Sequence, residues 1–332
     1  MHKYMLPMLE CPACHGKLEW TVTESDGEHV EKTEAICTSC AAVYPVHEGI
    51  GVFLTPDLQR HDLWEAADSG LTTYLRKHPD IERKLLDSPP EDLPPADQFF
   101  LAMVLEERGA FADAKEAESA AYAGIYTKEY QDCFKSQIDY VTKSVSSEVG
   151  PIIDLASGRG YLVEHLAQKL SRPIVATDFS PRVLRRDQRF FQFLGLTDQL
   201  SLVAFDARRT PFKDGAVKTM TTNLGLSNIE EPGRLLQELH RIIDGELLSI
   251  MSFFPDNDVA NRTAAKKLGI ASFMFKDSTL RLFNEAGFDV QLKNIRSGRA
   301  LPTPTSDLLE GAGIDALPIA ETELTWCTLV AR

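Results

Sequence analysis

The seven residues from Asp154 to Gly160 have the types and the spacing of a loop that binds an anion. Apolar residues before Asp154 are typical of a buried strand, and a helical pattern begins after Gly160. Backbone N–H groups at the start of a helix attract a carboxylate or a phosphate. Glycine at Gly158 and Gly160 lets a ligand lie against the backbone, because a side chain there would collide with it. The segment therefore predicts a strand, a ligand-binding turn and a helix.

Three polar residues farther along the chain each follow an apolar run that is typical of a buried strand. They are Asp178, Asp206 and Asn223. A carboxylate at the tip of the second strand of a nucleotide-binding fold can accept hydrogen bonds from both hydroxyls of a ribose. We therefore expect Asp178 to bind a ribose.

Four cysteines near the start of the chain form two C-x2-C pairs, Cys11 with Cys14 and Cys37 with Cys40. Four thiolates from two such pairs can occupy the corners of a tetrahedron, the geometry that Zn²⁺ prefers. The residues between the pairs alternate apolar and polar around a Ser-Asp-Gly-Glu turn, which is typical of a β-hairpin. The pattern predicts one structural zinc ion, because four cysteine ligands leave no open position for a substrate.

Disulfide bonds are the alternative for these cysteines. The chain shows no secretory signal peptide and no apolar span of the ~18 residues that cross a membrane. Two further cysteines, Cys133 and Cys327, lie far away and are expected to be small buried apolar residues. These features favour a reducing, cytoplasmic location without membrane contact, and zinc over disulfides. His15 and His47 are expected to be bystanders, because four thiolates already complete a zinc site.

Short apolar runs alternate with amphipathic helical patterns over the second half of the chain, which predicts an α/β fold. Asp244 and Gly245 are expected to form a turn before the fifth strand. Strands are predicted at residues 151–154, 173–177, 200–205, 216–222, 246–254, 288–295 and 324–331, and helices at residues 161–170, 181–194, 231–243 and 278–286.

The spacing of the glycine loop distinguishes between two nucleotide-binding families. A dinucleotide fold requires a glycine three positions after Gly160, where this chain has Val163. The acidic-x-G-x-G-x-G form instead resembles motif I of the class I S-adenosylmethionine (SAM) dependent methyltransferases (type 11/25-like), with Ala156 at the first glycine. The resemblance implies a Rossmann-like sheet of seven strands, mostly parallel, whose last strand is antiparallel.

The same resemblance implies SAM as co-substrate and assigns roles to residues. An acid at the end of the third strand, here Asp206, accepts from the adenine amino group in that family. The loop that begins at Asn223 lacks the N-P-P-Y/F signature of amino-group methylation and looks like that of small-molecule methyltransferases, such as those of quinone biosynthesis. No residue stands out as a general base, and His240 is expected to be structural. The expected SAM-binding residues are Asp154, Ala156, Ser157, Gly158, Gly160, Asp178, Phe179, Asp206, Ala207, Asn223 and Tyr126.

The cysteine-rich segment resembles the small zinc-ribbon proteins that partner tRNA and protein methyltransferases. The resemblance covers residues 5–56, and the run from Ala42 to Leu54 matches the closing strand of those proteins. It implies that the zinc is structural and that the segment presents a substrate or a partner.

Residues 57–145 have helical apolar spacing from Leu71 to Leu86 and from Gln98 to Tyr130, separated by two Pro-Pro pairs that predict a stiff extended connector. In related methyltransferases, helices at this place cover the SAM site and help to build the acceptor pocket. Tyr122, Tyr126 and Tyr130 recur every fourth residue and are expected on one helix face. They either pack on the sheet or, for Tyr126 or Tyr130, approach the SAM carboxylate or the pocket mouth. Residues 300–320 form a long excursion that is expected to act as a lid on the sheet edge.

The patterns predict three units, a zinc ribbon at residues 1–56, a helical linker or cap at residues 57–145 and a SAM-dependent methyltransferase domain at residues 146–332. The formal net charge is −14, and residues 1–143 hold 13 Lys and Arg against 26 Asp and Glu. Phosphate backbones select basic surfaces, so this charge disfavours RNA. The basic cluster Arg182, Arg185, Arg186 and Arg189 is expected to be a solvated helix face.

We therefore predict a SAM-dependent methyltransferase that acts on a small molecule. An RNA acceptor is the alternative within this class, because bacterial 23S rRNA guanine-N1 methyltransferases also place a zinc ribbon before this fold. A non-catalytic SAM-fold protein that binds a partner through the ribbon is the second class. The intact acids Asp154, Asp178 and Asp206 argue against that class.

Overall fold

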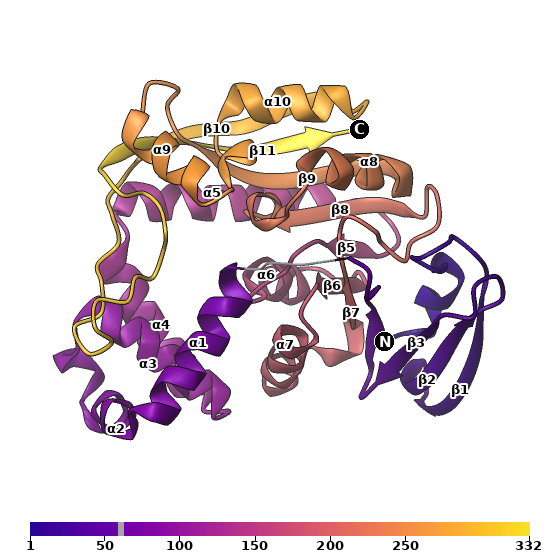
Figure 1. The fold of residues 1–332 in the computed structure, drawn as a ribbon, viewed down its shortest axis with the longest axis horizontal. Helices are drawn as coiled ribbons and strands as arrows, with labels where there is room; N and C mark the ends of the chain where they lie inside the picture. Colours follow the sequence, from indigo (N-terminus) through magenta and orange to yellow (C-terminus); the bar gives the residue numbers. More distant parts are fainter. Residues whose placement is uncertain (59–62) are drawn as a thin grey trace.

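The described residues contain a mixed sheet of 11 strands, and helices cover both faces of the part formed by β5 to β11 (Figure 1). The computed structural model describes residues 1–58 and 63–332. Seven strands, in the order β7-β6-β5-β8-β9-β11-β10, form the half of the sheet that carries the glycine loop. They are β5 (Ile152–Asp154), β6 (Ile174–Asp178), β7 (Leu200–Phe205), β8 (Val217–Asn223), β9 (Ile243–Phe253), β10 (Val290–Ala300) and β11 (Thr322–Ala331).

The direction of these strands follows the predicted plan. Strands β5 to β9 pair in parallel, whereas β11 is antiparallel to both of its neighbours, β9 and β10. The α/β class and the antiparallel last strand are therefore confirmed. All six residues of β7 are buried, because this strand is covered on both faces and paired along both edges.

The sheet has 11 strands instead of the expected seven, because the cysteine-rich segment joins it. The expected single closing strand at residues 42–54 is two strands, and Glu48 and Gly49 turn the chain between them. Both residues have positive φ, 50° and 76°, which is the backbone geometry of a tight hairpin turn. The four added strands are β1 (Leu18–Asp26), β2 (His29–Cys37), β3 (Val43–His47) and β4 (Ile50–Phe53).

Strand β4 connects the cysteine-rich segment to the rest of the sheet. It pairs in parallel with β7, and its last residue, Phe53, lies beside Phe205 at the carboxyl end of β7. Backbone hydrogen bonds add to this contact, from Glu10 N to Pro211 O at 2.7 Å. The two segments are thus joined through main-chain groups as well as through side chains.

The apolar core also crosses this junction. One cluster of buried side chains contains Met5 and Leu9 from the cysteine-rich segment together with Phe205 and Phe212 from the other half. Arg241 adds an ion pair to Glu10 at 2.9 Å. The cysteine-rich segment therefore shares a core with the domain that carries the glycine loop.

Helices pack on both faces of the sheet. On the face that the cysteine-rich segment shares lie α8 (Pro232–Ile242) and α10 (Lys276–Glu285). None of the described helices is both long enough and apolar enough to cross a bilayer. The helices that bury apolar residues on the other face are α5 (Lys128–Val145), α6 (Tyr161–Lys169), α7 (Pro181–Phe193) and α9 (Val259–Lys267).

Asp244 and Gly245 do not form the expected turn. They are the second and third residues of β9, which begins directly after α8. A Cβ on Gly245 would lie 2.0 Å from the carbonyl oxygen of Lys218 in β8. Only glycine therefore allows the two strands to approach this closely.

Residues 63–145 form five α-helices and differ in detail from the prediction. The expected helical stretch from Gln98 to Tyr130 is broken at Gly109, where φ is 78°, and again at Thr127, whose hydroxyl caps α5 by accepting from Tyr130 N. Pro95 begins a helix instead of extending the connector, because proline suits the first turn of a helix. Residues 59–62 of the predicted 57–145 unit lie outside the described residues. The helices before α5 are α1 (Leu63–Lys77), α2 (Pro79–Asp87), α3 (Pro95–Glu107) and α4 (Phe111–Ile125).

The long excursion between β10 and β11 leaves the sheet edge and reaches the helical layer around α3 and α4 (Figure 1). Leu309 and Ile314 belong to the same buried cluster as Phe100 of α3. Ser306 donates a hydrogen bond to Asp97, also of α3. The excursion therefore packs on the helices that precede β5, rather than lying on the sheet edge as expected.

Candidate functional site

A cavity of about 770 Å³ lies at the carboxyl ends of β5, β6, β7 and β8. One wall consists of the loops that follow these strands. The opposite wall comes from α3, α4, α5 and residues 313–315. The cavity therefore lies between the sheet and the helical layer, and its volume is in the usual range for a small-molecule site, roughly 300–1,000 Å³.

Most residues that the sequence predicts to bind SAM meet at this cavity. Asp154 and Gly160 do not line it, because they are the two ends of the loop, at the last residue of β5 and the residue before α6. The Oδ1 atom of Asp154 accepts from Thr221 at 2.6 Å, and its carbonyl oxygen accepts from the Thr177 hydroxyl at 2.8 Å. Asp154 thus attaches the loop to β6 and β8. The predicted residues that do line the cavity are Ala156, Ser157, Gly158, Asp178, Phe179, Asp206, Ala207, Asn223 and Tyr126.

Side chains hold the glycine loop in place from two directions. Gly158 N donates to Asp178 Oδ2 at 3.2 Å, and Ser180 N donates to Asp178 Oδ1 at 2.9 Å. Arg186 donates from Nη2 to the carbonyl oxygen of Gly158 at 3.0 Å. A loop that is fixed at both its N–H and its C=O groups is preorganised, which lowers the entropic cost of binding a ligand.

The two glycines of this loop differ in what a side chain would meet. A Cβ on Gly158 would have no atom within 4 Å, whereas a Cβ on Gly160 would lie 2.9 Å from Phe191. Both residues have positive φ, so a side chain at either position strains the backbone by about 1–2 kcal/mol.

This difference predicts separate effects for two matched variants. We expect Gly158→Val to abolish SAM binding with only a small loss of thermal stability, because the valine side chain enters the cavity. Gly160→Val should lower the melting temperature much more, since Phe191 must move. Calorimetry with SAM and thermal unfolding of both variants measure this. Near-normal SAM affinity of Gly158→Val would contradict the assignment of the loop.

Burial of Asp154 predicts a pH dependence of stability. Burial is the largest cause that raises the pKa of Asp154, to about 7, above its ordinary value near 3.8. The folded chain therefore binds the carboxyl proton of Asp154 more tightly than the unfolded chain does. The free energy that this proton binding adds to stability is complete below about pH 4 and is lost as the pH rises to about 7.

The variant Asp154→Asn lacks this titration. The free energy of unfolding of the wild-type chain minus that of Asp154→Asn should decrease from about pH 4 to pH 7 and stay level above it, with a slope of at most about 1.4 kcal/mol per pH unit. Urea unfolding of both proteins at several pH values measures the difference. A difference that does not change with pH would show that Asp154 keeps an ordinary pKa.

Asp206 takes part in an ion pair that the sequence did not predict. Arg208 donates from Nε to Oδ1 at 3.0 Å and from Nη2 to Oδ2 at 2.9 Å, and both side chains are almost fully buried. Arg208 also reaches Glu231 at 2.5 Å. A ligand that hydrogen-bonds to Asp206 therefore meets a buried charged pair rather than a lone carboxylate.

Asn223 lies at the end of β8, beside the glycine loop. A Cβ on Gly225, two residues later, would lie 2.9 Å from Cβ of Ala156, so the two loops are in close contact. The Oδ1 atom of Asn223 is buried and accepts no hydrogen bond from any described residue. Leaving a buried amide oxygen unpaired costs about 1–3 kcal/mol, which a ligand with a hydrogen-bond donor would relieve.

Tyr126 lines the cavity, but its hydroxyl already donates to Asp315 Oδ2 at 2.7 Å. The rings of Tyr122, Tyr126 and Tyr130 follow one another with centroids 4.8 and 4.6 Å apart. They do not share one helix as expected, because α4 ends before Tyr126 and α5 begins after it. Burial, followed by the negative charge of Asp315, holds the pKa of each tyrosine above its usual range.

Arg159, between the two glycines, joins the loop to the helical layer. Its Nη2 atom donates to Glu106 of α3 and to Glu118 of α4, each at 2.8 Å. Tyr161 at the start of α6 also donates to Glu118. Sequence reasoning missed this network, because Arg159 is 53 and 41 residues from its partners and no short pattern relates them.

The arginines of α7 are not simply solvated as expected. Arg182 pairs with Glu107 of α3 at 3.3 Å, and Arg185 pairs with Glu48 of the cysteine-rich segment at 3.7 Å. Arg189 donates to the carbonyl oxygen of Glu107 at 3.3 Å. Acidic residues of neighbouring elements therefore neutralise much of this basic face.

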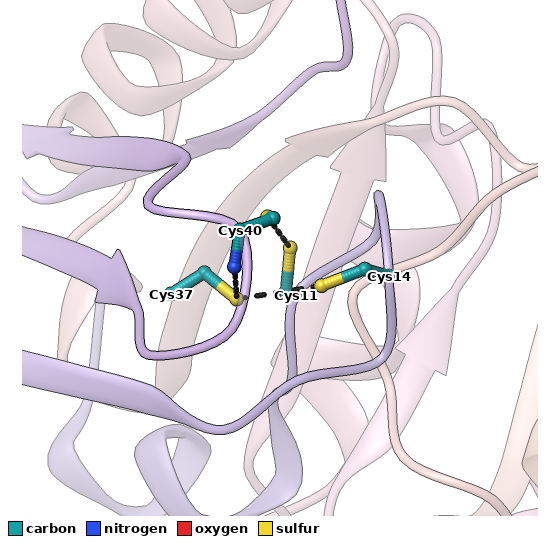
Figure 2. Close-up of side chains that lie close together, drawn as sticks. All are labelled: Cys11, Cys14, Cys37 and Cys40. Carbon is teal, nitrogen blue, oxygen red and sulfur yellow. Dashed lines mark hydrogen bonds between the residues drawn. The ribbon is translucent and has the colours of Figure 1, made fainter.

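The four cysteines of the C-x2-C pairs meet at one place (Figure 2). Cys11 and Cys14 precede β1, Cys37 is the last residue of β2, and Cys40 follows it. Their sulfur atoms all lie within 4.8 Å of one another, and all four are free thiols. Cys11 and Cys40 are 3.6 Å apart, and Cys14 and Cys37 are 3.5 Å apart. Four thiolates around Zn²⁺ at ~2.3 Å place the sulfurs ~3.8 Å apart, so this donor set fits a tetrahedral zinc ion.

The histidines near these cysteines make other contacts. His15 pairs with Glu10 at 2.7 Å, and His47 lies 3.8 Å from Glu48, each with an exposed ring. Among the described residues, the only group suited to hold a metal ion consists of the four cysteines. His240, on α8, packs edge-on against Phe288.

Comparisons with known proteins match two parts of the chain. Residues 153–246 match the model of a methyltransferase domain, and residues 2–49 match that of the Trm112p-like proteins. A demethylmenaquinone methyltransferase from Clavibacter sepedonicus is 35% identical over 103 residues, which is 31% of this chain and 40% of that protein. A 2-phytyl-1,4-naphtoquinone methyltransferase from Nostoc sp. is 30% identical over 114 residues, 33% of this chain and 50% of that protein.

Among solved structures, the YcgJ protein from Bacillus subtilis covers 59% of this chain and 97% of its own, with 12% identity and a TM-score of 0.48. The chain spans half or less of the length of the two curated relatives named above. The match to the methyltransferase domain nevertheless contains the glycine loop and all four strand ends. The match to the Trm112p-like proteins contains the four cysteines. This chain therefore carries a methyltransferase domain at residues 153–246, preceded by a Trm112p-like domain at residues 2–49.

Proposed function

We propose that this chain is a SAM-dependent methyltransferase that transfers the methyl group to a small-molecule acceptor. The observation that carries the proposal is the cavity of about 770 Å³ between the glycine loop and the helical layer. Its sheet side has the polar groups that a nucleoside with an amino acid tail requires. Asp178 would accept from the ribose hydroxyls, Asp206 would face the adenine, and the loop from Ala156 to Gly158, with Asn223 beside it, would hold the methionine part.

The sulfonium of SAM activates the methyl group, so the task of the chain is to position the acceptor in line and to exclude water. The helical wall suits this task, because it is mainly apolar and lies opposite the glycine loop. It contributes Phe99, Phe100, Met103, Ile125, Phe134 and Ile314 to the cavity.

A small molecule is favoured over RNA for two reasons. A concave, mainly apolar wall fits a compact ligand, whereas a phosphate backbone selects an exposed basic surface. The arginines of α7 pair with Glu107 and Glu48, and the first 143 residues are strongly acidic. The two relatives named above, a demethylmenaquinone methyltransferase and a 2-phytyl-1,4-naphtoquinone methyltransferase, support a small-molecule acceptor as well.

We further propose that Cys11, Cys14, Cys37 and Cys40 bind one structural Zn²⁺. We assign residues 1–56 as the zinc ribbon, residues 57–145 as the cap over the cavity and residues 146–332 as the catalytic domain. Four thiolate ligands close the coordination sphere, so the metal would supply folding energy rather than chemistry.

Labelled SAM tests the proposed activity. The full chain is incubated with fractionated small-molecule, RNA and protein pools, and SAM binding is measured separately by calorimetry. We expect label in the small-molecule pool. Label in RNA would support the nucleic acid alternative, and SAM binding without transfer to any pool would favour a non-catalytic role. A chain that does not bind SAM would refute the proposal.

A further inference from the structure

Arg159 connects the two walls of the cavity. It stands between Gly158 and Gly160 in the glycine loop, directly before the start of α6. Its Nη2 atom donates to Glu106 of α3 and to Glu118 of α4, each at 2.8 Å. One guanidinium nitrogen of the loop thus holds a carboxylate from each of two helices of the opposite wall.

The three charged side chains of this network are largely shielded from water. Their exposed fractions are 17% for Arg159, 16% for Glu106 and 19% for Glu118. Solvent and salt therefore screen their attraction less than that of a surface ion pair. Because both carboxylates contact the same nitrogen atom, removal of the guanidinium would leave two partly buried negative charges side by side. The way in which α3 and α4 meet at the loop therefore depends on Arg159.

Arg159 also contacts the apolar surface of the helical wall. The ring centroid of Phe99, on α3, lies 5.6 Å from the guanidinium carbon, a distance typical of a cation–π contact. Phe99 lines the cavity together with Phe100 and Met103 of α3 and Ile125 of α4. The two helices that bind Arg159 are therefore the helices that supply the apolar surface for an acceptor.

The loop end of this connection is a place where a ligand would act. Gly158 and Gly160 both have positive φ, and glycine has more backbone freedom than any other residue. A Cβ on Gly158 would have no atom within 4 Å, so the loop borders open space at this point. A ligand that fills this space restricts the backbone from which Arg159 projects. Restricting Arg159 in turn restricts the two carboxylates that it holds.

We propose that Arg159 is a positioning residue that makes SAM binding at the loop and the ordering of α3 and α4 depend on each other. This rests on the proposed function, in which SAM is the ligand of the loop. Coupling between two sites acts in both directions. SAM therefore orders the apolar wall, and an ordered wall increases the affinity for SAM. Glu106 and Glu118 lie outside residues 153–246, so the part of the chain that matches the methyltransferase domain does not contain this connection.

Hydrogen exchange of the full chain with and without SAM tests the coupling, because a ligand slows exchange in the structure that it stabilises. In the wild-type chain, we expect SAM to slow amide exchange by about fivefold or more both at residues 151–158 and in α3 and α4, which is the lower end of typical coupling between sites. In Arg159→Met, residues 151–158 should keep this protection, whereas the effect on α3 and α4 should fall below about twofold. The affinity for SAM, measured by calorimetry, should fall by about fivefold. Arg159→Lys keeps the positive charge and should recover part of both effects.

Lys115→Met is the matched control, because Lys115 joins α4 to α6 through an ion pair with Glu164 that does not involve the loop. It should leave the effect of SAM on α3 and α4 as it is in the wild type. Exchange in α10, which does not line the cavity, gives the contribution of global unfolding. If Arg159→Met does not fold, a triple variant replaces it, in which Glu106→Gln and Glu118→Gln remove the repulsion between the two acids.

Two results would overturn the proposal. One is a wild-type chain that binds SAM without any change of exchange in α3 and α4 beyond that in α10. The other is wild-type protection of these helices in Arg159→Met or in the triple variant. Failure of the proposed function is distinguishable from both, because the wild-type chain would then not bind SAM at all.

Discussion

Asp178→Ala is expected to weaken SAM binding by about 2–4 kcal/mol, because two charge-assisted hydrogen bonds to the ribose would be lost. This corresponds to a roughly 30- to 800-fold increase in the dissociation constant. The structure adds a second reason for a large effect. Asp178 also accepts from the backbone N–H groups of Gly158 and Ser180, so the alanine variant loosens the glycine loop as well. Calorimetry with SAM measures the change, and unchanged affinity would refute this assignment.

Two variants set the scale for this result. Asp256→Ala removes an exposed carboxylate that pairs with Arg262, and it should leave SAM affinity unchanged. Asp206→Asn should weaken SAM less than Asp178→Ala, because the amide oxygen can still accept from adenine. It should also lower the stability of the fold, since the buried Arg208 loses a charged partner.

Removing zinc is expected to have the other large effect, on stability and on SAM binding together. Structural zinc sites contribute about 10–16 kcal/mol of binding free energy to small domains, so the four-cysteine segment should unfold without the metal. If the four-cysteine segment were an isolated unit, zinc loss would leave the affinity of the rest of the chain for SAM within a few-fold of its normal value. The structure changes that expectation, because β4 pairs with β7 and the carboxyl end of β7 leads into Asp206. We now expect SAM affinity to fall at least about tenfold on zinc loss, because the ligand must then also order a frayed sheet edge.

Metal analysis, chelation and the variant Cys37→Ser, compared with Cys133→Ser, test this coupling. Cys133 is a buried cysteine of α5 outside the cluster, so its variant should retain zinc. Zinc-free protein with normal SAM affinity would show that the ribbon and the SAM site are independent. Protein purified without chelator that contains no zinc, or that contains a Cys11–Cys14 disulfide, would contradict the zinc assignment.

The features that the sequence predicted well are local in the chain. The seven strands β5 to β11, the glycine loop and the two C-x2-C pairs each depend on residues within about ten positions of one another. Their side chains carry the signal directly, since a buried strand needs a continuous apolar run and a tight ligand-binding turn needs glycine. The strand ends at Asp154, Asp178, Asp206 and Asn223 followed from the same runs.

Local sequence patterns predicted the structure less reliably where backbone conformation, rather than side-chain burial, determines where a helix or strand ends. The helices around Tyr126 break because Thr127 provides a cap, although the apolar spacing continues through both helices. Residues 42–54 fold back at Glu48 and Gly49, two positions with positive φ inside an otherwise strand-like run. Gly245 was expected to turn the chain, yet it lies in β9 because the Lys218 backbone passes 2.0 Å from where its Cβ would be.

Only the tertiary structure decided how distant segments meet. The pairing of β4 with β7 uses main-chain hydrogen bonds, which leave no mark in side-chain composition. Tyr126 and Asp315 are 189 residues apart, and their contact depends on where the excursion before β11 packs. By itself, therefore, the sequence determined most of the strands and helices, the glycine loop and the two cysteine pairs, because short-range sterics and burial specify them. The second wall of the cavity and the attachment of the ribbon to the sheet were decided by packing between elements far apart in the chain.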